Sequence, residues 1–359
     1  MQQTNTHKST PIPHISVWQY AEKIFHYILP LAVSLGLIIW LFKKVDFKDM
    51  LEVLKNGVNY WWLILMMIVL TLSRAIRGIR WGYQLRAAGI TDMPPIAEVM
   101  SIFGAYALNL VFSWVGEAWR CLYVARRQHT SLSTVVGTDI GDRASDAIVV
   151  MTLVFVSFFV ARPALDKFLM HYAVGKDLFH FFTDVWIWCG LALIGLAIWA
   201  IAKFFSHCKY VENIEKVIKE LWSGFKVLFT MNHKQAYWTL TLCIWICYFL
   251  ETYLCFFAFP FLKPLFTDPG MFYGLVPGLI VFVFGSCSIA VPSTGGLGPW
   301  NLAVMFALSL YGISTTDAAA YSFVVWGFQT GIQIVLGIIC ALYVMGTKSS
   351  ASKCDKSEQ

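Results

Sequence analysis

The length of its apolar runs constrains this chain more than any other feature. A helix needs about 20 mainly apolar residues to cross the hydrocarbon core of a bilayer, and such runs recur throughout the sequence. Of the 359 residues, 58% are hydrophobic and only 13% are charged, whereas about a quarter of a soluble domain is charged. We therefore predict an all-α polytopic membrane protein. Its eight hydrophobic segments lie at about 24–42, 60–86, 96–115, 133–160, 184–205, 236–259, 271–291 and 317–345.

The order of these segments indicates two membrane repeats. Amphipathic stretches near 45–54 and 211–228 follow the first segment of each half and predict interfacial helices. The first 20 residues are polar, so no cleavable signal is expected. We predict a polar tail over 1–20, a first repeat over 21–160, a loop over 161–183, a second repeat over 184–346 and a polar tail over 347–359.

The basic residues suggest a topology. They cluster at 74–86, at 120–127, at 203–234 and in the C-terminal tail. Short loops rich in Lys and Arg usually face the cytoplasm. If all four clusters do so, then 96–115 and 271–312 are re-entrant hairpins that break near 109–116 and 292–298. The prediction is then six full crossings, cytoplasmic termini and two halves inverted relative to each other, a recurring transporter plan. Eight plain crossings are the alternative.

The stretch 109–146 carries ionisable residues where a plain membrane helix would carry leucine. They are Glu117, Arg120, Asp139, Asp142, Arg143 and Asp146. Charges at membrane depth are costly and usually face a cavity or one another. The last four share one helix face, because offsets of 0, 3, 4 and 7 span about 100°. We predict a polar cluster inside the bundle, in which Arg143 bridges two carboxylates.

Polar residues also interrupt other segments. Three arginines near the end of the second segment are spaced three residues apart: Arg74, Arg77 and Arg80. They cover one helix face, and either snorkel to head groups or form a cationic wall for an anionic head group. Glu251 is expected to bond a neighbouring helix or to serve in ion coupling. Gln329 and Gln333, one turn apart, are expected to bridge helices.

Four motifs, taken in order, carry a family resemblance. They are Arg77-Gly78-Ile79-Arg80-Trp81, then Asn109 with Gly116-Glu117 and Arg120, then Asp142-Arg143-x-x-Asp146, and finally Pro292 with Gly295-Gly296-x-Gly298. From about 24 to 345 the chain resembles the flippase-like family that includes the membrane region of lysylphosphatidylglycerol synthases. It departs from that family at Ser113 and Trp114, where members often carry Pro and Arg, and at Asn301, where many carry Glu. We therefore expect a substrate that differs from that of a typical member.

The resemblance implies movement of a polar-headed lipid, anionic or lipid-linked, between the leaflets of a prokaryotic cytoplasmic membrane. Arg80, Arg120 and Arg143 would line a cavity and pair with a phosphate, and Glu117 and Glu251 are the coupling candidates. The sequence has no GxxxxGK[ST] nucleotide motif, so uphill transport would need an ion gradient or a partner. The predicted substrate-binding residues are Arg77, Arg80, Asn109, Glu117, Arg120, Asp142, Arg143, Asp146, Pro292, Gly295, Gly296, Gly298 and Asn301.

Two other functions stay open from the sequence. Clustered carboxylates with an arginine also suit an intramembrane enzyme that acts on a lipid-linked phosphate or sugar. Buried Asp–Arg pairs also suit a non-catalytic scaffold for envelope assembly. We expect no lipid aminoacylation, because no soluble aminoacyl-transfer domain follows the membrane region in this sequence. We also expect no cofactor, no metal site and no nucleic-acid partner, and we leave a homo-oligomer open.

Overall fold

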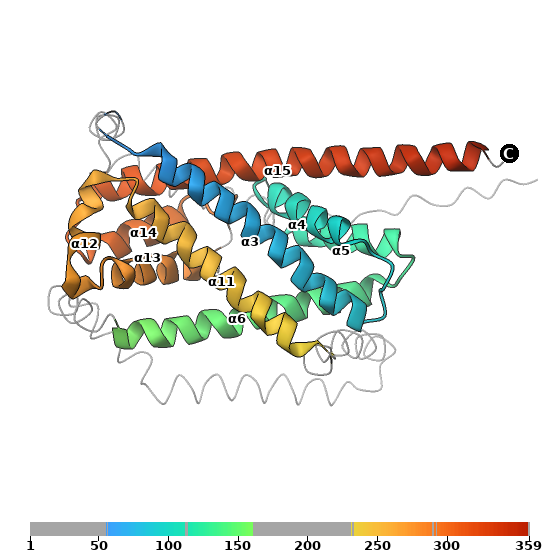
Figure 1. Ribbon diagram of the computed structural model, residues 1–359, viewed down its shortest axis with the longest axis horizontal. Coiled ribbons are helices and arrows are strands. Elements are labelled where there is room, and N and C mark those ends of the chain that lie inside the picture. The colour runs from blue at the N-terminus through green and yellow to red at the C-terminus, as the bar shows by residue number, and fades with distance from the viewer. Residues whose placement is uncertain are drawn as a thin grey trace, which may run out of the picture.

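In the computed structural model, residues 55, 57–111, 114–160, 231, 233–288, 291 and 293–357 are described. The regular structure in these ranges is entirely helical, as predicted (Figure 1). The α-helices are α3 (Tyr60–Ala87), α4 (Pro95–Asn109), α5 (Val115–Arg127), α6 (Leu132–Val160), α11 (Lys234–Phe256), α12 (Lys263–Thr267), α13 (Leu275–Cys287), α14 (Pro299–Ser309) and α15 (Thr315–Ser357). Two 3₁₀ turns, η1 (Pro260–Leu262) and η2 (Pro269–Met271), flank α12.

Several predicted elements lie outside the described residues. They are the tail 1–20, the segments 24–42 and 184–205, the interfacial helices near 45–54 and 211–228, the loop 161–183, and Pro292. Parts of both predicted repeats therefore lie outside the described residues. The inverted repeat and the count of eight segments therefore stay predictions.

Helices α3 and α11 pack side by side in the middle of the molecule (Figure 1). The 28 residues of α3 make a helix about 42 Å long, which exceeds the roughly 30 Å hydrocarbon core of a bilayer. Leu63, Met66 and Leu70 are fully buried, at the i, i+3, i+7 spacing of one helix face. They belong to a core cluster that also contains Cys255 and Phe256 of α11.

Four helical stretches in the described part of the chain are long and apolar enough to cross a membrane: Tyr60–Ala87, Lys234–Phe256, Pro269–Cys287 and Thr315–Thr347. Large hydrophobic side chains on these helices are exposed, among them Ile68 on α3, Leu242 on α11 and Leu342 on α15. Contiguous exposed apolar surface marks a membrane or partner contact. Length, composition and exposure therefore agree on a helical membrane protein.

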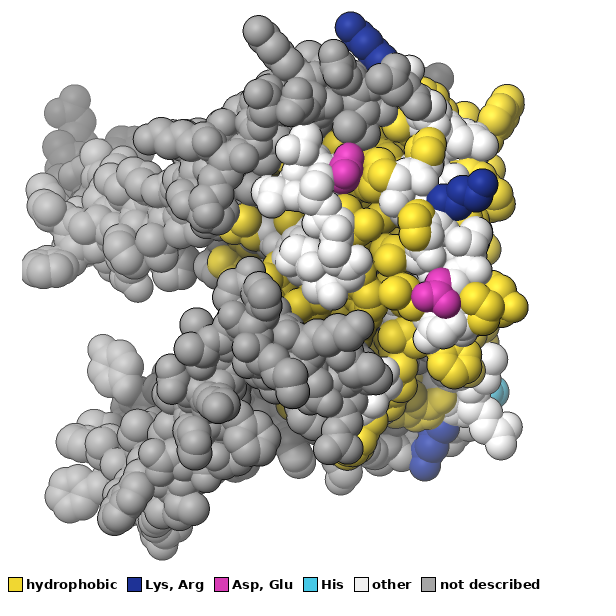
Figure 2. Space-filling view, turned by 90° about the vertical axis from the view of Figure 1, so that its left-hand side faces the viewer, with side chains coloured by type: hydrophobic (Ala, Val, Ile, Leu, Met, Phe, Trp, Pro, Cys, Tyr) yellow, Lys and Arg dark blue, Asp and Glu magenta, His cyan; other side chains and the backbone are white. Residues whose placement is uncertain are grey.

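At the end of the molecule that carries α12, hydrophobic side chains are mixed with polar groups and backbone over the described surface (Figure 2). Phe272, Tyr273 and Leu275 are exposed there, with exposed fractions of 65%, 59% and 46%. Aromatic residues are enriched where a membrane meets water, because the rings sit at the level of the head groups. This end therefore has the composition of an interfacial surface.

Two helical hairpins stand where the sequence predicted broken segments. Helix α4 ends at Asn109 and α5 begins at Val115, while α13 ends at Cys287 and α14 begins at Pro299. The 15 residues of α4 reach only about 22 Å, too short to cross the hydrocarbon core alone. Figure 1 shows the α4–α5 hairpin in one half of the long dimension and the α13–α14 hairpin in the other. The geometry fits two hairpins that enter from opposite ends.

The first hairpin closes tightly because of Gly116. A Cβ atom on this residue would collide with the backbone carbonyl oxygen of Ala105 on α4. Gly78 on α3 plays the same part against α4, since a Cβ there would lie 2.6 Å from the Cα of Val99. These glycines let backbones approach as closely as small residues do in membrane helix packing.

Helix α15 is longer than predicted. The sequence indicated an apolar segment ending near 345 and a polar tail from 347, but α15 continues to Ser357. No proline occurs between residues 340 and 357, and a polar sequence without one does not end a helix by itself. Hydropathy marks where an apolar segment ends, which is a different boundary from the end of the helix.

Candidate functional site

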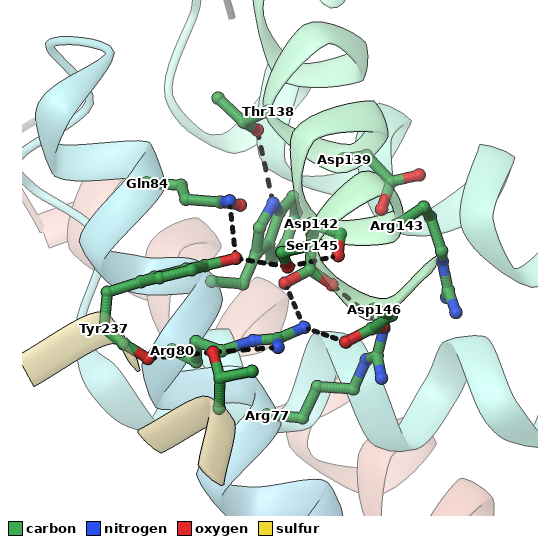
Figure 3. A network of polar contacts seen from close by, with 12 residues as sticks. Arg77, Arg80, Gln84, Thr138, Asp139, Asp142, Arg143, Ser145, Asp146 and Tyr237 are labelled. Carbon is green, nitrogen blue, oxygen red and sulfur yellow. Dashed lines mark hydrogen bonds and ion pairs between the residues drawn. The ribbon is translucent and has the colours of Figure 1, made fainter. Parts of the chain in front are cut away.

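Two arginines of α3 face two aspartates of α6 in a buried ion-pair network (Figure 3). Arg80 Nη2 lies 2.6 Å from Asp142 Oδ1 and 2.9 Å from Asp146 Oδ1. Arg77 Nη2 lies 3.0 Å from Asp142 Oδ2 and also pairs with Asp146. The arginines are three residues apart and the aspartates four, so each pair shares one face of its helix. The four charges balance within a closed set.

The burial of these groups makes the pairing essential. The side chains of Arg80 and Asp142 are fully buried, Arg77 is 2% exposed and Asp146 is 15% exposed. An isolated charge in such a position is very costly, whereas a paired and hydrogen-bonded charge is tolerated. The network therefore fixes α6 against α3 and also places Asp146 at its more open end.

Further hydrogen bonds extend the network to α11. Arg80 Nη1 donates to Thr241 Oγ1 at 3.2 Å. The Tyr237 hydroxyl lies 2.7 Å from Ser145 Oγ on α6 and accepts a hydrogen bond from Gln84 Nε2 at 3.0 Å. Figure 3 shows Tyr237 reaching from α11 toward α6. Three helices are thus joined by polar contacts inside an apolar bundle.

The prediction that Arg143 bridges two carboxylates of its own helix is wrong. Arg143 pairs instead with Glu117 of α5. Asp139 pairs with Arg120, also of α5, whose guanidinium lies 4.2 Å from the ring centroid of Trp81. The aspartates of α6 find cations on the helices packed against them, and Arg143 lies on the side of α6 nearest α5. The aspartates of α6 therefore pair with arginines of the facing helices and not with Arg143.

Asn109 organises the break between α4 and α5. Its Oδ1 accepts from the backbone N–H of Gly116 at 2.8 Å, and its Nδ2 donates to Glu117 Oε2 at 2.7 Å. Its backbone carbonyl accepts from Gly295 N at 3.3 Å, so the tips of the two hairpins touch. Gly295 in turn accepts from Trp326 Nε1 of α15 at 2.9 Å. The two breaks meet in the middle of the bundle, where transporter sites commonly lie.

The second break uses glycine conformations and a side-chain cap. Gly295, Gly296 and Gly298 have φ values of 59°, 76° and 94°, which residues with a Cβ rarely adopt. Asn301 is fully buried, and its Oδ1 accepts from Gly298 N at 3.1 Å at the start of α14. Asn301, predicted to bind substrate, makes the contact of the third helical residue in a capping box.

A cavity of about 490 Å³ lies where the hairpin tips meet, within the roughly 300–1,000 Å³ range of small-molecule sites. Its walls come from α3, α4, α5, α6, α11, α13, α14, α15 and both breaks. Its charged lining residues are Arg74, Arg77 and Arg143 with Glu117, Asp146 and Glu251. Its aromatic lining residues are Tyr106, Trp114, Trp245, Tyr248, Phe282, Trp300 and Trp326. Polar and aromatic groups thus surround one chamber inside an apolar bundle.

A family model described as the lysylphosphatidylglycerol synthase TM region matches residues 27–337. The chain belongs to this family. The match spans most of the sequence and confirms the resemblance seen in its motifs. It agrees with the apolar helices in making the chain a membrane protein. No curated protein and no solved structure matches the chain.

In this member of the lysylphosphatidylglycerol synthase TM-region family, about half of the predicted substrate-binding residues line the cavity. The predicted residues that line it are Arg77, Asn109, Glu117, Arg143, Asp146, Gly295 and Gly296. The coupling candidate Glu251 lines it as well. Five predicted residues do not line it, namely Arg80, Arg120, Asp142, Gly298 and Asn301. Arg80 and Arg120, expected to face a phosphate, are buried in ion pairs instead.

Sequence reasoning left some lining residues out of the site. Arg74 was considered for a cationic wall but was not among the predicted substrate-binding residues, and Gln329 and Gln333 were expected to bridge helices. Tyr106 and Tyr248 were not among the predicted site residues, yet both line the cavity. A tyrosine in the middle of an apolar helix is the signal that could have found them, because its hydroxyl needs a polar partner when buried.

Proposed function

We propose that this protein moves a polar-headed lipid between the leaflets of a membrane through the cavity. The observation that carries the proposal is one chamber lined by three arginines and three carboxylates inside a bundle of membrane-length apolar helices. A head group cannot cross hydrocarbon without a polar path, and ionisable residues at membrane depth commonly mark substrate paths. On this proposal the protein is a transporter of a prokaryotic cytoplasmic membrane, with both termini cytoplasmic.

The two hairpin tips supply the moving parts. Trp114 has a φ of 72° at the first break and is 69% exposed on the cavity lining. Left-handed backbone at a bulky residue is strained and tends to occur where a structure switches. Rocking of one hairpin against the other would open the chamber to one side at a time, as in other proteins with broken helices.

Glu117 is the proposed coupling residue. It lines the cavity, pairs with Arg143 and accepts from Asn109 beside the break. Protonation of this carboxylate would release Arg143 and change the contact between α5 and α6. Glu251 is the second candidate, since it is the other carboxylate of the chamber without a place in the network of α3 and α6.

The test is lipid exchange in liposomes that contain the purified protein. A fluorescent phospholipid is placed in both leaflets, and dithionite added outside bleaches only the outer label. With a working transporter, we expect the bleached fraction to rise from about half toward completion. A panel of head groups identifies which lipids are moved.

The chain offers a matched pair of variants for this test. Ala147 lines the cavity, whereas its neighbour Ile148 on α6 is 51% exposed and does not line it. Ala147→Trp should fill the chamber and remove most of the exchange, while Ile148→Trp should leave the rate near that of the wild type. Equal rates for both variants, or no exchange above protein-free liposomes, would contradict the proposal.

The same preparation separates the two alternatives. An intramembrane enzyme would consume a lipid-linked substrate in detergent, where no second compartment exists. A scaffold would keep its function in any variant that folds, including Ala147→Trp. Asp142 and Asp146 are each bound by two arginines, which favours a packing role for both, with Asp146 also lining the cavity, over a free cluster of carboxylates.

A further inference from the structure

Arg74 stands apart from the other cations of the cavity. Arg77 is held by Asp142 and Asp146, and Arg143 is held by Glu117. Arg74 lines the same chamber, but no carboxylate in the described ranges lies within the 4.0 Å of an ion pair. Its Nε is buried without a hydrogen-bond partner, as are those of Arg77 and Arg143, so the missing carboxylate is what sets Arg74 apart. A buried charge without a paired counter-charge is costly, and an anionic ligand in the chamber would supply that counter-charge.

Two tyrosines hold the guanidinium of Arg74 in place. Its central carbon lies 3.9 Å from the ring centroid of Tyr106 on α4 and 5.1 Å from that of Tyr248 on α11. A guanidinium stacked on aromatic rings gains cation–π attraction. Stacking occupies the faces of the group and leaves its edge, where the N–H donors lie, for a planar or forked anion. A phosphate is the anion that this geometry suits.

A carboxylate lies beside this arginine without being paired to it. Glu251 of α11 lines the cavity and is 5% exposed. Its Oε1 accepts a hydrogen bond from Ser73, the residue that precedes Arg74, at 2.7 Å. In the described part of the chain no cationic nitrogen lies within 4.0 Å of this carboxylate. One unpaired positive group and one unpaired negative group therefore share one wall of the chamber.

We propose that Arg74 and Glu251 form a head-group subsite for zwitterionic phospholipids that carry a primary amine. The phosphate binds at the edge of Arg74, and the ammonium donates hydrogen bonds to Glu251. A purely anionic head group would satisfy Arg74 but would place its phosphate beside an unneutralised carboxylate. This subsite rests on the proposed transport function and adds the class of lipid that is moved.

The test measures equilibrium binding, separately from transport. Short-chain phosphatidylethanolamine and phosphatidylglycerol share one phosphodiester and differ in an ammonium against hydroxyls. Binding of each to the detergent-solubilised full chain is measured by titration, for the wild type, Arg74→Gln, Glu251→Gln and Arg126→Gln. Arg126 is exposed near the end of α5 and does not line the cavity, so its variant is the matched control for a lost positive charge.

We expect the wild type and Arg126→Gln to bind the amine-bearing lipid about tenfold more tightly, the effect of one hydrogen bond to a charged group. Glu251→Gln should remove that preference while it keeps phosphate binding. Arg74→Gln should weaken both lipids about equally, by about tenfold. If Arg74→Gln does not fold, Arg74→Lys replaces it and should weaken both lipids while the preference between them persists.

Two results would overturn the subsite. One is an unchanged preference in Glu251→Gln, and the other is equal or tighter binding of phosphatidylglycerol by the wild type. Failure of the transport proposal has a different signature, because amine-selective binding that depends on Glu251 could then be present without exchange in liposomes. The two proposals therefore stand or fall on separate measurements.

Discussion

Replacing Asp142 by asparagine tests whether the α3–α6 network holds the fold together. Arg77 and Arg80 are balanced by Asp142 and Asp146, and Asp142 binds both arginines, with contacts of 3.0 Å and 2.6 Å. Asp142→Asn leaves two buried cations with one carboxylate. Removal of one partner from a buried ion pair typically costs about 3–5 kcal/mol. Because Asp142 is fully buried, we expect a cost near the upper end of that range.

The assay is thermal unfolding of the purified protein in detergent, followed by the loss of the monodisperse peak in size-exclusion chromatography. A cost of this size should lower the apparent Tm by on the order of 10 °C, since each kcal/mol moves the Tm of a 150–250-residue domain by about 2–4 °C and that of a longer chain by less. Asp92 is exposed and lies outside the ion pairs of the described residues. Asp92→Asn removes the same charge and should shift Tm by little.

A double variant separates lost charge balance from lost shape. Arg80→Gln combined with Asp142→Asn leaves Arg77 facing Asp146, one cation to one carboxylate. The double variant should therefore cost less than the sum of the two single variants, by at least about 1 kcal/mol. The reasoning is refuted if Asp142→Asn shifts Tm no more than Asp92→Asn, or if the two single effects add.

Three further predictions concern the hairpins. Gly116→Ala should destabilise the protein by about 1–3 kcal/mol through overpacking against α4. Gly331→Ala, whose added methyl group meets open space on α15, should be neutral or should stabilise the protein by up to about 1 kcal/mol through helix propensity. Thermal unfolding compares the two variants, and equal losses of stability would contradict the close approach of Gly116 to α4. Asn109→Ala should lower the stability by about 1–3 kcal/mol because it leaves the backbone N–H of Gly116 without its partner, and it should slow lipid exchange in liposomes. An unaltered Tm would show that the contact between Asn109 and Gly116 does not stabilise the break. Glu117→Gln keeps a hydrogen-bonding side chain but loses the ion pair with Arg143, so proton-driven exchange should stop while the protein stays folded; a wild-type driven rate would exclude Glu117 as the coupling group.

Local chemistry made much of this protein predictable. The apolar runs indicated membrane helices, and four of them appear as stretches long enough to cross. The positions of both breaks were also predictable, since α4 ends at Asn109 and α14 begins at Pro299. Glycine and proline disfavour helix in any context, so the second break needs no knowledge of neighbouring elements. The motif order was enough to indicate the family that residues 27–337 match.

The pairing of charges depended on tertiary structure. The sequence placed Asp142, Arg143 and Asp146 on one helix face, and this is why Arg143 was predicted to bridge two carboxylates. In the folded protein Arg77 and Arg80 bind both aspartates from α3. Helix spacing states which residues share a face, but it does not state which helix packs against that face.

The set of charged residues that line the cavity also depended on which helices pack together. The spacing of three residues made Arg74 one of three equivalent arginines in the sequence. In the folded protein Arg77 and Arg80 pair with the aspartates of α6, and Arg74 lies against two tyrosines. Glu251 is distant from Arg74 in sequence and reaches the same chamber only because α3 and α11 lie side by side. The sequence alone therefore determined the helices, their breaks and the family, because those follow from local composition and order. Only the packing of the helices decided which charges form ion pairs and which have no ion-pair partner in the described part of the chain, because that depends on distances between residues far apart in the sequence.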